Sequence, residues 1–153
     1  QAPLETGRPW LVCGNPGSGR STVLGVLAAQ WQLSPVAMVT PESAITPEML
    51  AGVPDGAVVL IDDADLLDPE IADALVGLLP RCRVVVAAST AAAQSTYRGI
   101  IAAVTQARTV LALGPSLPQH LAHARSALDP RGTPGRGVLV TARDVTAVQI
   151  ASP

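Results

Sequence analysis

Residues Trp10 to Thr22, WLVCGNPGSGRST, join a short apolar run, a glycine-rich turn and the start of a helix. The run from Leu11 to Cys13 is typical of a buried parallel strand. Three glycines follow, and they leave the backbone free of side chains where it must wrap closely around an anion. The next helix would present a partial positive charge and unpaired N–H donors at its N-terminus. The stretch therefore predicts a phosphate-binding loop between a strand and a helix.

The spacing from Gly14 to Ser21 fits the pattern G-x-x-x-x-G-K-[ST] at every fixed position except one. Arg20 stands where lysine is expected, and no other lysine can replace it, because all ten basic residues of the chain are arginine. Lysine reaches phosphates as a compact charge, whereas the wider guanidinium prefers bidentate contacts. The alternative interpretation is a glycine-rich turn that holds no ligand.

A second informative stretch is Ala57 to Asp63, AVVLIDD, an apolar run that ends in two carboxylates. Ligands bind at the carboxyl end of a central parallel strand, where these aspartates would lie. In nucleotide-hydrolysing proteins with such a loop, a first carboxylate, here Asp62, holds magnesium together with the loop hydroxyl, here Ser21. A second acidic residue, commonly glutamate, orients the attacking water. Asp63 is one methylene shorter, which predicts a base that reaches its water poorly. The alternative is that both aspartates begin a solvated turn.

The rest of the chain predicts helices and strands that alternate. Helices are expected at Ser21 to about Gln32, Pro47–Ala51, Pro69 to about Leu79, Thr96–Ala107 and Ser116–Ala127. Further strands are expected at Val36–Val39, Arg83–Ala88, Thr109–Leu113, Val138–Thr141 and Val145–Ile150. The last two strands, joined by a tight turn, predict an antiparallel hairpin that closes the sheet. Thr46 and Asp68 are the expected caps of the helices that follow them. Ser89 and Thr90 either contact a γ-phosphate or only cap the segment after them.

Composition narrows the function classes. The 153 residues suit one domain, and a hydrophobic content of 48% suits a sheet buried on both faces. The net charge of −2 and the scattered arginines disfavour an autonomous DNA-binding surface, which would show a basic stripe. No uncharged apolar run reaches the roughly 20 residues that span a bilayer. Because the chain begins at Gln1 and ends at Pro153, we expect residues 1–153 to be one domain excised from a longer protein.

The cysteines and histidines do not suggest a separate site. Cys13 and Cys82 are too few for a disulfide framework, so we expect both to be core thiols. His120 and His123 are three residues apart, but a metal site would need further ligands, and none is found nearby. We expect these histidines to be solvated or packed.

Four stretches together resemble the FtsK/SpoIIIE class of P-loop ATPases, and more narrowly the tandem ATPase domains of the type VII secretion motors EccC and EssC. They are residues 11–24 (LVCGNPGSGRSTVL), 58–67 (VVLIDDADLL), 84–98 and 134–151 (PGRGVLVTARDVTAVQIA). Many ATPases share the loop, so the tail after a fifth strand narrows the choice. The resemblance implies an α/β fold of the RecA-like P-loop NTPase type. Its mainly parallel sheet would be flanked by helices and would end in an antiparallel hairpin.

The resemblance also implies ATP and Mg²⁺ as ligands and assigns places to residues. Magnesium would be held by Ser21 and Asp62, and Asp63 would take the place of the catalytic carboxylate. No arginine finger is assigned, and Arg98 and Arg136 are only candidates. The phosphates would be held by Gly14, Asn15, Pro16, Gly17, Ser18, Gly19, Arg20, Ser21 and Thr22.

Departures from the active pattern at Arg20 and Asp63 favour a nucleotide-binding module with weak or absent hydrolysis. Its role in a secretion motor would be structural, regulatory or substrate-docking, on the cytosolic face of a membrane-anchored parent. Expected partners are neighbouring ATPase domains of the same chain or a ring, and signal peptides of secreted proteins. The alternatives are an ATPase that needs a neighbouring subunit, a DNA translocase, and a nucleotide-free peptide-docking domain. Trp10, Trp31 and Tyr97 give the last of these few aromatic anchors.

Overall fold

The computed structural model describes residues 6–15, 17–30, 36–96, 98–105, 107, 109–114, 117, 121, 124, 136–141 and 144–149. Its strands are β1 Trp10–Gly14, β2 Val36–Val39, β3 Val58–Ile61, β4 Arg83–Ala88, β5 Thr109–Leu113, β6 Arg136–Val140 and β7 Val145–Gln149. Its helices are α1 Arg20–Gln30, α2 Pro47–Ala51, α3 Pro69–Val76, α4 Thr90–Ser95 and α5 Gly99–Val104, with a 3-10 turn η1 at Ala64–Leu66. Both informative stretches therefore fold as a strand followed at once by a turn and a helical segment.

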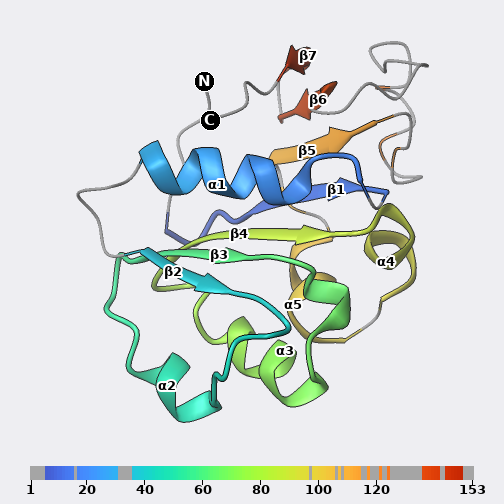
Figure 1. Ribbon diagram of the computed structural model, residues 1–153. Helices are drawn as coiled ribbons and strands as arrows, with labels where there is room; N and C mark the ends of the chain where they lie inside the picture. Colours follow the sequence, from blue (N-terminus) through green and yellow to red (C-terminus); the bar gives the residue numbers. More distant parts are fainter. Residues whose placement is uncertain are drawn as a thin grey trace.

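The seven strands form one sheet in the order β2-β3-β4-β1-β5-β6-β7 (Figure 1). The first five strands along the chain run parallel to one another. The last two add an antiparallel hairpin beside β5. The predicted α/β class and its C-terminal hairpin are therefore confirmed. Because β4 lies between β1 and β3, the carboxyl ends of the loop strand and the aspartate strand share one edge, one strand apart.

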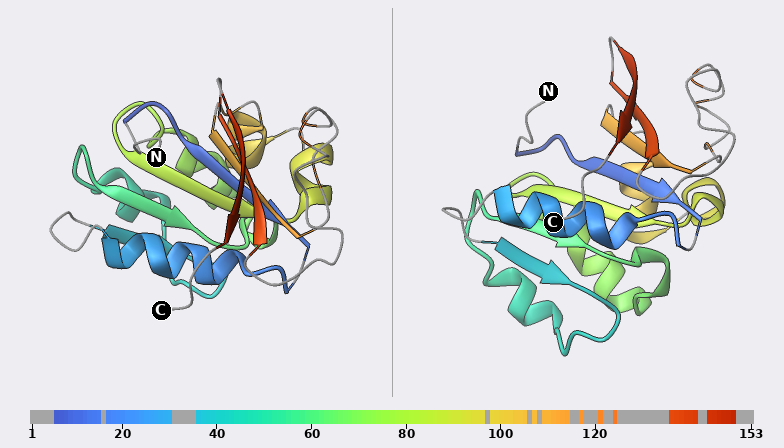
Figure 2. Two further views of the ribbon diagram at one scale, coloured as in Figure 1. Left: turned by 90° about the horizontal axis from the view of Figure 1, so that it is seen from above. Right: turned by 45° about the horizontal axis from the view of Figure 1, so that its top comes forward.

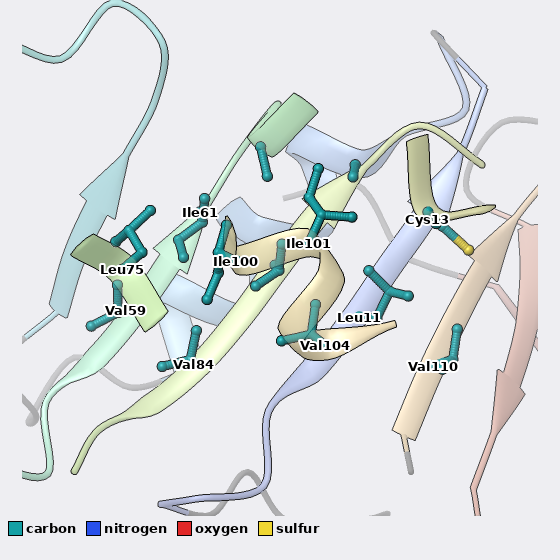
Figure 3. Close-up of a cluster of buried hydrophobic side chains, with 14 of the residues drawn as sticks. Leu11, Cys13, Val59, Ile61, Leu75, Val84, Ile100, Ile101, Val104 and Val110 are labelled. Carbon is teal, nitrogen blue, oxygen red and sulfur yellow. The ribbon is translucent and has the colours of Figure 1, made fainter. Parts of the chain in front are cut away.

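Helices cover both faces of the parallel strands, which explains why their sequences are apolar without alternation (Figures 1 and 2). On one face, α1 packs its Val23, Leu24 and Leu27 on residues such as Leu60 and Val85. The other face carries α3 and α5, and Figure 3 shows this larger cluster. Its labelled members are Leu11, Cys13, Val59, Ile61, Leu75, Val84, Ile100, Ile101, Val104 and Val110. None of the described helices has the length and apolar character needed to cross a bilayer.

The segment after β4 differs from the prediction. The sequence predicts one helix over Thr96–Ala107, but the structure has two helices of six residues each after β4, α4 and α5. The chain breaks between them because Gly99 has φ of +72°, a left-handed conformation that glycine tolerates. A Cβ at Gly99 would lie 3.0 Å from the Cβ of Ala72 on α3, so the glycine also permits close packing of α5 on α3.

Other helix boundaries also shift. The third helix ends at Val76 and not near Leu79, since Gly77 is a poor helix former and the next residues form turns. Thr46 caps α2 as predicted, because its hydroxyl accepts the N–H of Met49 at 3.2 Å. Asp68 holds the predicted cap position of α3, but its side chain makes no capping hydrogen bond.

Some predictions fall outside the described residues. Most of the expected helix at 116–127 lies there, together with His120, His123 and the end of the first helix. Of that region the structure describes Leu117, Leu121 and Ala124, and the last two are buried. The expectation for the thiols is confirmed, since Cys13 and Cys82 are both free and buried. Burial raises the pKa of the Cys13 thiol to about 12, so that thiol stays protonated at neutral pH.

The guanidinium of Arg81 joins the approach to β4 with the end of α2. One of its nitrogens donates to the carbonyl of Val53 and, at 3.1 Å, to Asp55. The other donates to the carbonyls of Leu50 and Ala51, both at 3.2 Å. These carbonyls lie at a helix end, where the backbone acceptors have no partner within the helix. Arg81 therefore fixes α2 against the sheet.

We expect Arg81→Ala to lower the free energy of unfolding by about 1–3 kcal/mol, because it leaves several carbonyls without their charged donor. Urea denaturation followed by circular dichroism measures this loss. The control is Asp55→Asn, which removes only a carboxylate that is 83% exposed and so is expected to change little. Equal unfolding midpoints for Arg81→Ala and the parent would contradict this role.

Candidate functional site

The turn between β1 and α1 has the conformation that its glycines allow. Gly17 and Gly19 have φ of +84° and +103°, which side-chain-bearing residues rarely adopt. A Cβ at Gly14 would collide with the hydroxyl of Ser18 and lie 3.1 Å from Leu113. The N–H of Ser18 closes the turn on the carbonyl of Asn15 at 3.1 Å. The three glycines are thus required by the local backbone, as the pattern predicts. Pro16 lies outside the described residues.

Two buried polar atoms at this turn have no hydrogen-bond partner among the described residues. They are the Oγ of Ser18 and the Nη1 of Arg20. A buried donor without a partner costs free energy, so such atoms usually mark a place for water, an ion or a ligand. Both atoms can donate to an anion, and the N-terminus of the eleven-residue α1 adds its own N–H donors beside them. The turn therefore fits a phosphate group.

Ser21 and Asp62 come together as predicted, although 41 residues separate them. The Oγ of Ser21 donates to Oδ2 of Asp62 at 2.6 Å. The other carboxylate oxygen accepts the N–H of Asp63 at 2.9 Å, which fixes its orientation. Hydroxyl and carboxylate oxygens are ligands that Mg²⁺ prefers. No group of three or more acidic, histidine or cysteine residues suited to a metal ion occurs in the described ranges. An ion at this pair would complete its coordination with phosphate oxygens and water.

Arg20 points from the start of α1 toward the end of β3. Its Nη2 lies 3.3 Å from Oδ1 of Asp63, and its Nη1 lies 3.9 Å from Oδ1 of Asp65. We call these three residues the Arg20 cluster. Only 11% of the arginine side chain is exposed, so the ion pair is partly shielded from water. The guanidinium is thus engaged with Asp63, the carboxylate that the resemblance assigns to the catalytic place, and the sequence did not predict this contact.

Asp65 is the site residue that sequence reasoning missed. It follows Asp63 by two residues in the sequence IDDAD, and this density of carboxylates was the available signal. The chain turns sharply here, because Asp63 adopts the left-handed conformation with φ of +46° and ψ of +48°. That turn brings Asp65 back to the same sheet edge. Its Oδ1 also accepts the N–H of Ser89 at 3.4 Å, so it links η1 to the start of α4.

Negative charge exceeds positive charge around Asp63. Partial burial raises the pKa of its carboxyl above the usual value, and the neighbouring Asp62 carboxylate raises it further. The Arg20 guanidinium lowers that pKa, while Asp65 and Glu42 act to raise it. One guanidinium thus faces several carboxylates at this sheet edge. Such a place favours a further cation, in keeping with a magnesium ion.

The remaining candidate residues, two at the start of α4 and two arginines, lie in different parts of the structure. The hydroxyl of Ser89 accepts the N–H of Ala92 at 3.1 Å, so its capping interpretation is confirmed. Thr90 is buried at the start of α4. Arg98 is exposed at the start of α5. Arg136 is exposed at the start of β6, where its Nε donates to the side chain of Gln149 at 3.0 Å.

Three solved structures show what this fold is similar to. The cytoplasmic domain of the type VII secretion ATPase EccC of Thermomonospora curvata matches 95% of this chain with a TM-score of 0.63 and 17% identity. ATPases 2 and 3 of that EccC, in complex with a signal sequence peptide, match 95% with a TM-score of 0.62 and 16% identity. The cytoplasmic domain of EssC matches 94% with a TM-score of 0.67 and 12% identity.

The chain spans 24% of the EccC cytoplasmic domain, 37% of the two-ATPase structure and 39% of the EssC structure. No protein-family model and no curated protein matches the sequence. At these identities the similarity is one of fold. The chain therefore has the P-loop ATPase fold found in the ATPase domains of type VII secretion motors.

Proposed function

We propose that this chain is an ATP-binding module of a type VII secretion motor, with weak or absent hydrolysis. The observation that carries the proposal is the arrangement at one sheet edge. A glycine-dependent turn with two buried donors that lack a hydrogen-bond partner among the described residues lies beside the hydrogen-bonded pair of Ser21 and Asp62. The fold is that of secretion ATPase domains, and this edge is where parallel sheets bind ligands.

Each part of the site has a role in binding. The backbone N–H groups of the loop from Gly14 to Thr22, which Pro16 lacks, and the N-terminus of α1 would hold the phosphates. Ser18 and Arg20 supply side-chain donors that no described residue satisfies. Ser21 and Asp62 would hold a magnesium ion, which would supply positive charge beside the phosphates. When bound, that ion neutralises phosphate charge, and the remaining contacts are made by this chain.

Weak turnover follows from the Arg20 cluster. Asp63, in the place of the catalytic carboxylate, is paired with the guanidinium at 3.3 Å, so it does not act as a free base. The same pairing holds Nη2 of Arg20 on Asp63, so that nitrogen is not free to contact the transferred phosphate as a lysine would. Loss of one electrostatic donor to a transition state costs about 3 kcal/mol, or a factor of 10²–10³ in rate. A chain with both changes binds nucleotide better than it hydrolyses it.

The same comparison supports a proposal for the setting of the module. We propose that residues 1–153 form one ATPase-like domain that contacts neighbouring ATPase domains in its chain or in a ring. Its place is the cytosolic side of a membrane-anchored parent. In a docking role, the domain would bind the signal sequence of a secreted protein, since one EccC structure is in complex with such a peptide. DNA translocation is disfavoured by the net charge of −2.

The test measures binding of a fluorescent ATP analogue by anisotropy, with and without magnesium. The parent should bind, and magnesium should strengthen its binding. In Ser21→Ala magnesium should no longer strengthen nucleotide binding, because the substitution removes a ligand of the ion. With magnesium present, the dissociation constant of this variant should therefore be about tenfold higher than that of the parent. Ser95→Ala is the matched control, since this exposed serine donates to the carbonyl of Ala91 within α4.

Phosphate release from the same samples distinguishes a binding module from an active enzyme. Release near background at saturating ATP supports the binding module. Fast release by the isolated parent would favour a competent ATPase. An equal magnesium effect in Ser21→Ala and the parent would remove the assigned ion site.

A further inference from the structure

We propose that this site takes a nucleoside diphosphate in preference to a triphosphate, because the Arg20 cluster closes the place of the third phosphate. The inference rests on the proposed function, in that nucleotides must bind at the loop. It concerns whether the site selects a diphosphate or a triphosphate, and the evidence for it is the set of contacts that Arg20 makes.

The ion pair spans the place that a third phosphate needs. In sites with this loop, the residue at position 20 reaches the β- and γ-phosphates, and the strand-end carboxylates act on the γ-phosphate through magnesium. A third phosphate must therefore come between Arg20 and the carboxylates that follow β3. In this structure Nη2 of Arg20 lies 3.3 Å from Oδ1 of Asp63. That separation leaves no room for a phosphoryl group between the two side chains.

Several contacts hold the pair in place. Arg20 is 11% exposed, and charges shielded from water interact more strongly than charges on an open surface. Its second nitrogen lies 3.9 Å from Asp65, whose carboxylate also accepts the N–H of Ser89. The cluster thus joins α1, η1 and α4. Displacing Arg20 would leave the carboxylates of Asp63 and Asp65 without their cation, next to the incoming negative phosphate.

A diphosphate avoids this conflict. Its two phosphates lie within the turn, where Ser18 Oγ and the backbone N–H groups face them. Nη1 of Arg20 is buried without a hydrogen-bond partner among the described residues. It can donate to the terminal phosphate while Nη2 stays on Asp63. Arg20 then binds the diphosphate and keeps its ion pair, which a triphosphate would break.

The experiment is calorimetric titration of the protein with ADP and with AMP-PNP, an ATP analogue that resists hydrolysis. Magnesium is left out, because it binds the triphosphate more strongly and would mask the difference. The parent should bind ADP more tightly than AMP-PNP by about tenfold, the size expected when one charge-assisted contact must be broken. In Asp63→Asn the two dissociation constants should approach each other.

Asp55→Asn is the matched control. This aspartate precedes β3, at the opposite end of the strand from Asp62, and pairs with Arg81. It should keep the parent's preference for ADP. Asp65→Asn weakens the cluster from its other side, so it should shift the ratio in the same direction by less. It also provides the test if Asp63→Asn does not fold.

The outcomes separate this inference from the proposed function. Equal or tighter binding of AMP-PNP by the parent would overturn the diphosphate preference and leave nucleotide binding intact. An ADP preference that survives in both folded aspartate variants would show that the cluster does not cause it, and would also overturn the inference. No binding of either nucleotide by the parent would overturn both proposals together.

Discussion

Replacing Arg20 by lysine is expected to raise the affinity for magnesium-bound ATP by about tenfold or more. Lysine presents a compact charge on a flexible stem, and it lacks the planar fork with which Arg20 reaches two aspartates. The ammonium group is therefore free to reach the phosphates. The space that the Arg20–Asp63 ion pair occupies becomes available to the third phosphate. Calorimetric titration of parent and variant side by side measures the change.

The matched control for this variant is Arg83→Lys. Arg83 begins β4, at the opposite end of the strand from the site, and its Nε donates to the carbonyl of Gly56 at 3.1 Å. The control should bind ATP as the parent does. An unchanged affinity in Arg20→Lys would mean that the guanidinium does not limit nucleotide binding, and it would remove the reason given for weak hydrolysis.

Truncating Leu60 to alanine is expected to lower the free energy of unfolding by about 2–5 kcal/mol. Leu60 is fully buried in β3, where it packs in the cluster that joins the sheet to α1. Deleting its side chain removes buried apolar surface and leaves a cavity that the surrounding strands fill only in part. The loss would appear as a lower urea midpoint at an unchanged slope.

Leu66→Ala is the control for this prediction. Leu66 lies in η1, close in sequence to Leu60, but 66% of it is exposed. Its truncation should change stability by at most about 0.5 kcal/mol. If both leucine variants unfolded at the midpoint of the parent, the assignment of Leu60 to the core would be wrong.

Much of the fold follows from local pattern. The runs in β3 and β4 are apolar at every inner position, so they predict strands buried on both faces, and the structure places them at the centre of the parallel strands. The glycines of the loop predict a tight turn, and Gly17 and Gly19 do adopt conformations that need glycine. These features depend on residues that are close together in the sequence, so the sequence alone is enough to predict them.

Features that depend on distant contacts were not predictable. The six-residue α4 is rich in alanine and has no clear apolar stripe, so its pattern resembles a loop or the start of a longer helix. The placement of β4 between β1 and β3 comes from strand pairing across the whole chain. Local propensity carries no information on that pairing.

The sequence predicts which residues form most of the site, but it does not predict all the contacts between them. The sequence indicates which hydroxyl and carboxylate face each other, because a loop helix and an aspartate strand share one sheet edge, and Ser21 and Asp62 do meet. The direction of the Arg20 side chain was beyond reach. It depends on the left-handed turn at Asp63, which brings Asp65 toward α1. From the sequence, arginine at position 20 indicates only that the compact charge of lysine is missing. The structure shows that its guanidinium also forms an ion pair with Asp63.

We propose that this chain binds ATP at the loop without efficient turnover. The most direct measurement is calorimetric titration of the parent with ATP and magnesium, together with Arg20→Lys. We predict heat from a single site in the parent and tighter binding in the variant. No heat in either protein would contradict ATP binding at the loop and leave a docking domain built on an ATPase fold.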